Sequence, residues 1–399
     1  MDIIDRLSRR ENWESFLEYR IEKRHIPAAE QKEWRNYIEE ERYLPLANEL
    51  GQGSFVPPLP KKAEISKSGS AKKRTIYTYP ADFSMLLKLC VWLLHEYDGV
   101  FCDNCYAFRT KRGAADAVRL LQRSGTERLY GFKADVSDYF NSIDAERLIG
   151  KLSFLREKDE RLLALFEKML RADAAIDRNG NVIREKHGAM AGIPTAPFFA
   201  NVYLGDLDSR FSDRLYFRYS DDILIFAESP GERDEFAEEL KQCLYEAGLK
   251  LNPDKTKLIA PGESYEFLGF SIEGDKVDIS HAALEKMKAK IRRKARALSR
   301  WAAEKEIPPE RGAKGFIKAM NRKFFSDEAR DGFSWSRWFF PVITTDESLR
   351  LLDAHMQQYV RYCITGRHYK GNYRHSYDEL KALGYRSLVH EYYAEREGR

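Results

Sequence analysis

The sequence predicts an α+β fold, because short strands and helices alternate through the middle of the chain. Four apolar or alternating runs have the length and pattern of strands, at residues 130–136, 216–219, 223–227 and 267–272. Helical stretches lie between these runs. Residues 1–55 have helical spacing, and the tail after about residue 279 has no comparable strand run. This interleaving is typical of an α+β domain flanked by helical segments.

Composition indicates a globular protein. Of the 399 residues, 43% are hydrophobic, which is enough to bury the cores of two or three domains. The start lacks a basic flank followed by an apolar run, and the most apolar stretch, 85–94, is short and interrupted by Lys88, so neither export nor membrane spanning is expected. Five scattered cysteines favour a reducing cytoplasm. Two of them, Cys102 and Cys105, form a lone CxxC without the further ligands that a tetrahedral zinc site needs.

The distribution of charge is more informative than its sum. The chain has 67 Lys and Arg against 63 Asp and Glu, a formal charge of only +4 that does not by itself indicate a nucleic-acid partner. Basic residues gather around Ser68, Gly69 and Ser70, after the Pro-rich joint 56–60, as a turn suited to phosphate. They gather again in a helix candidate at 285–300.

Three aspartates form a candidate metal site. Asp135 ends a predicted strand, and Asp221 and Asp222 lie in a predicted hairpin turn between two apolar runs. Crowded carboxylates resist ionisation unless a hard cation neutralises them, and Mg²⁺ takes such oxygen ligands together with substrate phosphates. An isolated Asp pair in a turn is more often ordinary turn chemistry. The flanking strands and the distant Asp135 favour a pair of Mg²⁺ ions.

These blocks resemble, in order and spacing, the palm of reverse transcriptases over about residues 60–275. The segment 219–222 resembles the YxDD box, and 135–140 resembles the acidic block before it. The resemblance implies that Asp135, Val136, Asp221 and Asp222 hold two Mg²⁺ ions and that dNTPs are the substrates. It implies a right-hand polymerase fold with an antiparallel palm sheet, divided into a helical N-terminal extension (1–55), fingers (56–130), palm with part of the fingers (131–278) and a helical thumb (279–399).

By the same resemblance, Phe140 is the steric gate, a ring against the sugar C2′ that leaves little space for a hydroxyl. The alternative is a core aromatic at a helix start. The segment 188–201 resembles the block that shapes the nucleotide and template pocket, with Gly192 and Pro194 in it and glycine allowing backbone to approach the substrate. The family usually has a Pro-Gln pair where Met190 and Ala191 stand in this chain. The missing Gln puts one usual contact near the nucleotide sugar in doubt.

Cationic residues also match family blocks. Lys255 resembles a general acid for the departing pyrophosphate, although a solvated surface lysine is an equal alternative. Lys73 and Arg74 resemble the strand that clamps the triphosphate, with a solvated charge run as the alternative. Arg109 is a candidate template or nucleotide contact. The segment 265–270 resembles the primer-grip hairpin, although a core strand is a competing interpretation.

The C-terminal region indicates the subfamily. It shows no endonuclease-like segment and no spaced acid set for an RNase H domain, which disfavours a self-contained mobile element. It also lacks the Val-Thr-Gly thumb signature expected of retron enzymes. The segments 333–341, 366–370 and 384–389 resemble bacterial defence-associated reverse transcriptases of the unknown group, with the single-gene type 2 class as one candidate. The basic helix at 285–300 would track a primer-template duplex in a thumb.

These resemblances imply an RNA-directed DNA polymerase that copies a noncoding RNA in antiphage defence, on an RNA/DNA or DNA primer-template duplex. Three alternatives share the fold: a retron or group II intron-type enzyme, a template-independent or protein-primed polymerase, and a non-catalytic RNA-binding scaffold. The presence of all three aspartates argues against the scaffold. The template, the priming group, the oligomeric state and the trigger of activity are not specified by the sequence.

Overall fold

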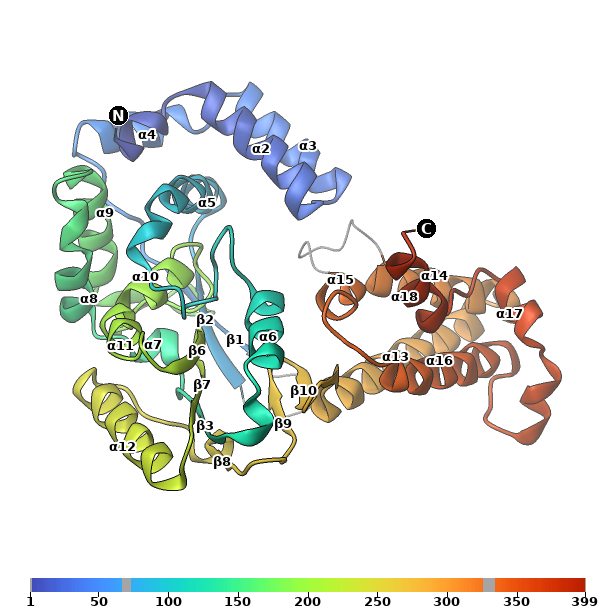
Figure 1. Ribbon diagram of the computed structural model, residues 1–399. Helices are drawn as coiled ribbons and strands as arrows, with labels where there is room; N and C mark the ends of the chain where they lie inside the picture. Colours follow the sequence, from blue (N-terminus) through green and yellow to red (C-terminus); the bar gives the residue numbers. More distant parts are fainter. Residues whose placement is uncertain (1, 67–72, 326–333, 399) are drawn as a thin grey trace. The chain divides into compact units, whose positions relative to one another are not determined.

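The computed structural model describes residues 2–66, 73–325 and 334–398 (Figure 1). The chain divides into two compact units, Met1–Arg20 with Ala29–Glu263, and Ile21–Ala28 with Ser264–Arg399. The basic turn at 68–70 and Phe333 of the segment 333–341 lie outside the described residues. Within those residues, no helix combines the length and the apolar character needed to cross a membrane.

The N-terminal segment is helical, as its spacing predicts. Trp13, Tyr37 and Tyr43 are buried together, with the rings of Trp13 and Tyr43 stacked 4.9 Å apart. The indole Nε1 of Trp13 donates to the carbonyl oxygen of Leu7 at 2.7 Å, so burial leaves its polar atom satisfied. The helices are α1 (Ile3–Arg6), α2 (Arg10–Arg24), α3 (Ala28–Glu39) and α4 (Leu44–Gly51).

A first sheet joins segments more than 90 residues apart in the chain. Its strand order is β2-β1-β4-β5, in which β1 pairs antiparallel with β2 and parallel with β4. The strands are β1 (Lys61–Ser66), β2 (Lys73–Thr78), β4 (Ala174–Ile176) and β5 (Val182–Arg184). The helices between β2 and the next sheet are α5 (Ala81–Leu94), η1 (His95–Val100), α6 (Ala114–Arg123) and η2 (Thr126–Arg128).

The second sheet is antiparallel, in the order β6-β7-β3-β8. Three of its strands match the runs predicted from the sequence, and α12 packs against β3 and β7 (Figure 1). The strands are β3 (Tyr130–Asp135), β6 (Leu215–Tyr219), β7 (Asp222–Ala227) and β8 (Lys257–Ile259). The helices around them are α7 (Tyr139–Ser142), α8 (Ala145–Lys151), η3 (Leu152–Leu155), α9 (Glu160–Arg171), α10 (Ala196–Tyr203), α11 (Gly205–Arg210), α12 (Pro230–Glu246) and η4 (Pro253–Lys255).

The second unit begins with the three-stranded sheet β11-β10-β9. The prediction of one strand run at 267–272 is wrong, because Leu268 and Gly269 have φ of +54° and +86° and turn the chain into a hairpin. The indole Nε1 of Trp338 donates to the carbonyl oxygen of Leu268 at 3.2 Å and holds this turn. The strands are β9 (Tyr265–Phe267), β10 (Phe270–Glu273) and β11 (Lys276–Ile279).

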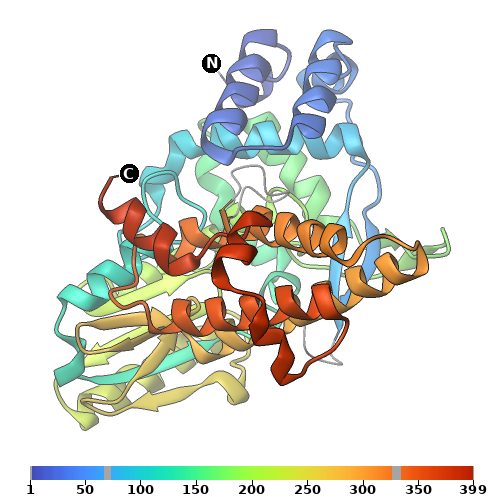
Figure 2. The same ribbon diagram turned by 90° about the vertical axis from the view of Figure 1, so that its right-hand side faces the viewer.

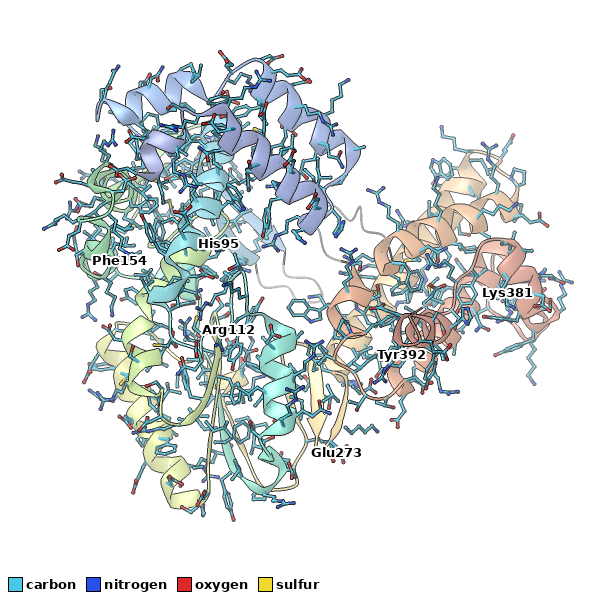
Figure 3. All side chains as sticks on the ribbon, turned by 45° about the horizontal axis from the view of Figure 1, so that its top comes forward. His95, Arg112, Phe154, Glu273, Lys381 and Tyr392 are labelled. Carbon is cyan, nitrogen blue, oxygen red and sulfur yellow. The ribbon has the colours of Figure 1, made fainter. Side chains whose placement is uncertain are left out.

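Helices make up the rest of this unit. The basic helix expected at 285–300 lies within α13, whose buried residues Leu284, Met287 and Ile291 follow helical spacing. Helices α13, α14 and α16 pack on one another (Figure 2), and Tyr392, labelled in Figure 3, donates from α18 to the carbonyl oxygen of Ile343 at 2.9 Å. The helices are α13 (His281–Glu304), α14 (Pro309–Phe325), α15 (Trp335–Phe339), α16 (Glu347–Thr365), η5 (Lys370–Arg374), α17 (Tyr377–Ala382) and α18 (Leu388–Arg396).

Candidate active site

Two strand ends bring the predicted aspartates together. Asp135 is the last residue of β3 and the register partner of Asp222, the first residue of β7. Directly paired residues of antiparallel strands project from the same face of the sheet, so these two carboxylates share a face. The backbone N–H of Val136 donates to the carbonyl oxygen of Asp221 at 3.1 Å. The end of β3 is therefore tied to the turn that carries the other two aspartates.

Arg218, a buried arginine on β6, supports that turn. Ser220, with φ of +62°, and Asp221 connect β6 to β7, and Arg218 Nη1 donates to the carbonyl oxygen of Ser220 at 3.3 Å. The guanidinium is fully buried and donates two hydrogen bonds to the carboxylate of Asp208. Its Nε donates to Oδ1 at 2.6 Å, and its Nη2 donates to Oδ2. Sequence reasoning missed this pair, although a charged residue inside an apolar strand was its signal.

The carboxylates repel one another. Burial raises the pKa of Asp221, and the charge of Asp135 raises it further. Burial also raises the pKa of Asp222 to about 6, with Asp221 and Asp135 adding to the shift and Lys133 opposing it. Lys133 Nζ lies 3.6 Å from Asp222 Oδ1, yet that oxygen is buried and accepts no hydrogen bond from the described residues. The turn thus holds negative charge that the described part of the chain neutralises incompletely.

Lys255 lies against the third carboxylate. Its Nζ is 2.5 Å from Asp135 Oδ1, and the side-chain amide of Asn252 donates to Asp135 Oδ2 at 3.3 Å. Burial lowers the pKa of Lys255, but the hydrogen bond and the charge of Asp135 outweigh this and raise it overall. Lys255 is therefore a protonated counter-ion of Asp135, its side chain is 57% exposed, and its role as a general acid stays a prediction.

The carboxylates suit a metal site that is completed by the substrate better than one that is formed by protein side chains alone. Within residues 2–66, 73–325 and 334–398, no three His, Cys, Asp or Glu side chains lie close enough to hold an ion by themselves. Mg²⁺ in nucleotide enzymes is commonly held by one or two carboxylates while substrate phosphates complete its shell. The unbonded buried oxygen of Asp222 and the two neighbouring carboxylates suit such an ion. Binding of Mg²⁺ by Asp135, Val136, Asp221 and Asp222 stays a prediction.

The predicted nucleotide side lies next to these carboxylates. The guanidinium carbon of Arg74, on β2, is 5.9 Å from the ring centroid of Phe140, on α7. The positive charge of Arg74 also acts to lower the pKa of Asp221. Lys73, by contrast, is exposed and pairs with Glu64 at 2.8 Å. The structure thus brings together Arg74, Phe140 and the aspartates, and gives Lys73 a partner on the neighbouring strand.

The glycine-rich block joins α7 to β2. Its backbone N–H groups at Ala189 and Ala191 donate to Phe140 O at 2.8 Å and to Asn141 Oδ1 at 3.0 Å, and Tyr77 N donates to Ala191 O at 2.7 Å. Sequence reasoning did not single out Asn141, which links the two elements. Pro194 is half-buried in the turn before α10.

Gly192 in this block lies close to backbone of the chain itself, and its approach to the substrate stays a prediction. Its φ is +105°, and a Cβ there would lie 2.8 Å from the carbonyl oxygen of Tyr77 and 3.2 Å from the Cβ of Ile76. The close approach is to β2, the strand of Arg74, because the block packs edge-on against that backbone. Gly192 positions the strand.

Replacing Gly192 with Ala is expected to lower the free energy of unfolding by about 2 kcal/mol or more, because backbone strain and a clash with β2 add together. Gly180 is the matched control, since its φ is +88° but a Cβ there meets nothing within 4 Å. Chemical denaturation of both variants measures the difference. Equal losses for Gly192→Ala and Gly180→Ala would show that the packing against Tyr77 is unimportant.

Arg109 organises a loop. Its guanidinium donates to the carbonyl oxygens of Cys102 at 2.8 Å, Asp98 at 2.9 Å and Cys105 at 3.3 Å. The predicted contact with template or nucleotide has no support in this geometry. Cys105 is buried beside Arg218, whose Nη2 lies 3.2 Å from its sulfur, and Cys102 lies 3.1 Å from Ser209 Oγ. The hairpin at 265–270 belongs to the other compact unit, and its role as primer grip stays a prediction.

A comparison with known proteins identifies the family of the part of the chain that contains these residues. The family model described as reverse transcriptase (RNA-dependent DNA polymerase) matches residues 60–272, more than half of the chain. No curated protein sequence matches. Among solved structures, Candida albicans telomerase in complex with a fragment of telomeric RNA shares 13% identity and a TM-score of 0.45, covering 87% of this chain and 68% of its own.

Two structures of Candida tropicalis telomerase are similarly distant. The apo enzyme truncated from its C-terminal domain shares 14% identity with a TM-score of 0.42, and 55% of each chain is covered. The apo enzyme shares 13% identity with a TM-score of 0.44, covering 76% of this chain and 56% of its own. The chain therefore spans little more than half the length of these two proteins.

Proposed function

Because the chain belongs to the reverse transcriptase family, the RNA-dependent DNA polymerases, we propose that it extends a primer with dNTPs on an RNA template at Asp135, Asp221 and Asp222. The observation that carries this proposal is the convergence of the three carboxylates at the end of β3 and the β6–β7 turn, with Arg74 and Phe140 beside them. The primer 3′-hydroxyl attacks the α-phosphate, and pyrophosphate leaves. Positioning and charge stabilisation supply most of the catalysis in such a transfer.

The chain's own residues would position the reactants. Asp135, Asp221, Asp222 and the carbonyl of Val136 would hold two Mg²⁺ ions, which supply charge stabilisation to the attacking and leaving oxygens. The planar guanidinium of Arg74 would bind the triphosphate with paired hydrogen bonds. The hydrogen bond to Asp135 and its charge raise the pKa of Lys255 and so keep this lysine protonated. When Asp135 binds the metal ion, Lys255 would leave the carboxylate and bind the departing pyrophosphate.

Phe140 would select the sugar. Its ring is half-buried and lies on the side of α7 that faces Arg74, where a 2′-hydroxyl would meet it. Phe140→Ala is expected to raise incorporation of rNTPs relative to dNTPs at least about tenfold, because one contact of this size is worth roughly 1–3 kcal/mol of discrimination. Single-nucleotide insertion kinetics with dCTP and CTP measure the ratio. Tyr139→Phe is the control, and an unchanged ratio in Phe140→Ala would remove the gate assignment.

Primer extension tests the activity itself. The purified chain is incubated with a primed RNA template, Mg²⁺ and either dNTPs or rNTPs, beside an Asp221→Asn/Asp222→Asn double variant. The proposal requires dNTP-dependent extension by the wild type alone. Extension by the double variant as well would assign the activity to a contaminant.

We further propose that the template is a noncoding RNA and that synthesis takes place in the cytoplasm of a bacterium as part of antiphage defence. The support is the resemblance of segments 366–370 and 384–389 to defence-associated enzymes. Sequencing the RNA that copurifies with the chain tests the first part, and one dominant structured RNA is expected. Phage plating on cells that carry wild type or Asp221→Asn tests the second, and equal plating on both would contradict it.

A further inference from the structure

A second nucleic-acid site is indicated in the C-terminal unit, well apart in sequence from the catalytic residues. Residues 354–377 contain no Asp or Glu, although these acids make up 63 of the 399 residues of the chain. The same 24 residues contain four Lys or Arg, and so carry by themselves the formal charge of the entire chain, +4. They also contain five tyrosines and three histidines. A solvated helix end would not require this exclusion of acids.

The structure folds this segment around a cavity of about 280 Å³. The cavity lies where α16 ends, at Gly366 with φ of +74°, and the chain passes through η5 toward α17, the helix of Lys381 in Figure 3. Its wall includes Gln358, Arg361, Tyr369, Lys370 and Tyr373 and no carboxylate. The volume falls just below the roughly 300–1,000 Å³ of pockets that take whole small molecules, which suits one planar group.

Exposed rings line this cavity. Tyr373 is 78% exposed, with the guanidinium of Arg361 5.6 Å from its ring centroid. Tyr369 is 38% exposed, and the guanidinium of Arg367 lies 4.7 Å from its ring. Rings that alternate with cations on a surface form the stacking platforms of single-strand binding sites.

The loop is held in shape independently of any ligand. The side chain of Asn372 is buried and both of its ends are bonded, with Nδ2 donating to Arg367 O and Oδ1 accepting from Thr365 Oγ1, each at 2.8 Å. His368 stacks on Tyr362 at 4.7 Å with their planes 19° apart. A Cβ on Gly371 would lie 2.3 Å from the ring of Tyr369, so this ring rests on bare backbone. Such preorganisation lowers the entropic cost of binding.

The cations remain available for phosphate. Among the residues that the structure describes, none of the four Lys and Arg of this segment pairs with a carboxylate within 4 Å; they are Arg361, Arg367, Lys370 and Arg374. Lys381, just outside the segment, pairs with Asp378 at 3.4 Å, so ion pairs resume where acids do. Unpaired cations bind phosphate, and exposed aromatic rings stack on bases. Nucleic acid is the ligand that offers both groups.

We infer that the basic and aromatic segment 354–377 binds an unpaired stretch of RNA. One base would lie in the cavity against Tyr369 or Tyr373, and adjacent phosphates would contact Lys370 and Arg367. The inference rests on the proposed function, in which the chain works on RNA. A duplex would not fit, because its bases are stacked and cannot enter a cavity of this size. The exposed amide of Gln358 can donate to and accept from a base edge or a 2′-hydroxyl. This segment would hold an unpaired part of the template RNA.

Binding is tested on the full-length chain with a fluorescein-labelled single-stranded RNA of about 12 nucleotides, within the range of single-strand sites. EDTA and a saturating unlabelled primer-template duplex remove the contribution of the active site. Tyr373→Ala is expected to weaken binding about tenfold while Tyr373→Phe retains it, because stacking needs the ring alone. Lys370→Gln is expected to reduce the magnitude of the slope of log affinity against log salt concentration by about 0.7. This is the contribution of the counterions released by one phosphate contact.

Tyr245→Ala is the matched control, since Tyr245 is 76% exposed on α12 and has Glu246 beside it. Wild-type affinity in Tyr373→Ala, a loss of equal size in Tyr245→Ala, or equal competition by single-stranded DNA would each overturn the inference. Cross-linking of 4-thiouridine-labelled RNA to residues 367–374 supports it. Asp222→Asn should bind and cross-link like wild type. Absence of polymerase activity would therefore leave this result intact, and Tyr373→Ala should extend a saturating primed template normally.

Discussion

Asp222→Asn is expected to abolish polymerisation and at the same time to stabilise the metal-free protein. Loss of a ligand to the catalytic ions should reduce primer extension roughly a thousandfold or more, since those ions contribute several kcal/mol to catalysis. The stabilising effect follows from burial, which raises the pKa of Asp222 to about 6 with help from Asp221 and Asp135. A shift of about two pKa units corresponds to roughly 2–3 kcal/mol against the charged carboxylate.

The sign of this effect depends on pH. A folded-state pKa above the unfolded value means that the folded protein holds its proton more tightly, so the penalty is full above pH 6 and disappears below about pH 4. Thermal melts in EDTA should therefore show Asp222→Asn above wild type at pH 7.5 and equal to it at pH 4. Asp213→Asn, an exposed substitution, should change neither value. A lower melting temperature for Asp222→Asn at pH 7.5 would contradict this account of the site.

Asp208→Asn is expected to cost about 3–5 kcal/mol of stability, because it leaves the guanidinium of Arg218 buried without a counter-ion. Both side chains are essentially inaccessible to solvent, and Arg218 also holds the carbonyl oxygen of Ser220. The double variant Asp208→Leu/Arg218→Met should recover most of the loss, since apolar residues of similar size often replace a buried pair without penalty. Its primer extension should stay tenfold or more below wild type, because small misplacements of reacting groups are costly.

Denaturant unfolding and steady-state extension of the single and double variants separate stability from positioning. The control is Glu239→Gln, which breaks a partly exposed pair with Arg214 and should cost less than about 1 kcal/mol. A double variant as active as wild type would show that Arg218 contributes only to the fold. A double variant no more stable than Asp208→Asn would show that the pair itself is needed for folding.

Local sequence patterns were sufficient for the strands and for the turn that carries the aspartates. The apolar run 223–227 and the acid near the end of 130–136 are properties of neighbouring residues, and the structure forms β7 and β3 at these places. The apolar run 267–272 by itself predicts one strand, because both sides of the turn are apolar, and it conceals the positive φ values of Leu268 and Gly269. The resemblance of 265–270 to the primer-grip hairpin does imply a hairpin, and the structure forms one there.

Contacts between distant segments could not be predicted in this way. The salt bridge between Arg218 and Asp208 depends on α11 packing under β6, and the link through Asn141 depends on the block at 188–192 lying against β2. Gly192 illustrates the difference. Its residue type suggested a close approach, but only the tertiary structure identifies the backbone of Tyr77 as the neighbour.

Extension of a primed RNA template is the most direct test of the central claim. With Mg²⁺ and dNTPs, the wild-type chain should produce complementary DNA, with rNTPs it should not, and Asp221→Asn/Asp222→Asn should produce none under either condition. Failure of wild type with its copurified RNA and with every primer offered, in a preparation that is folded by thermal melt, would contradict the claim and leave the chain an RNA-binding scaffold.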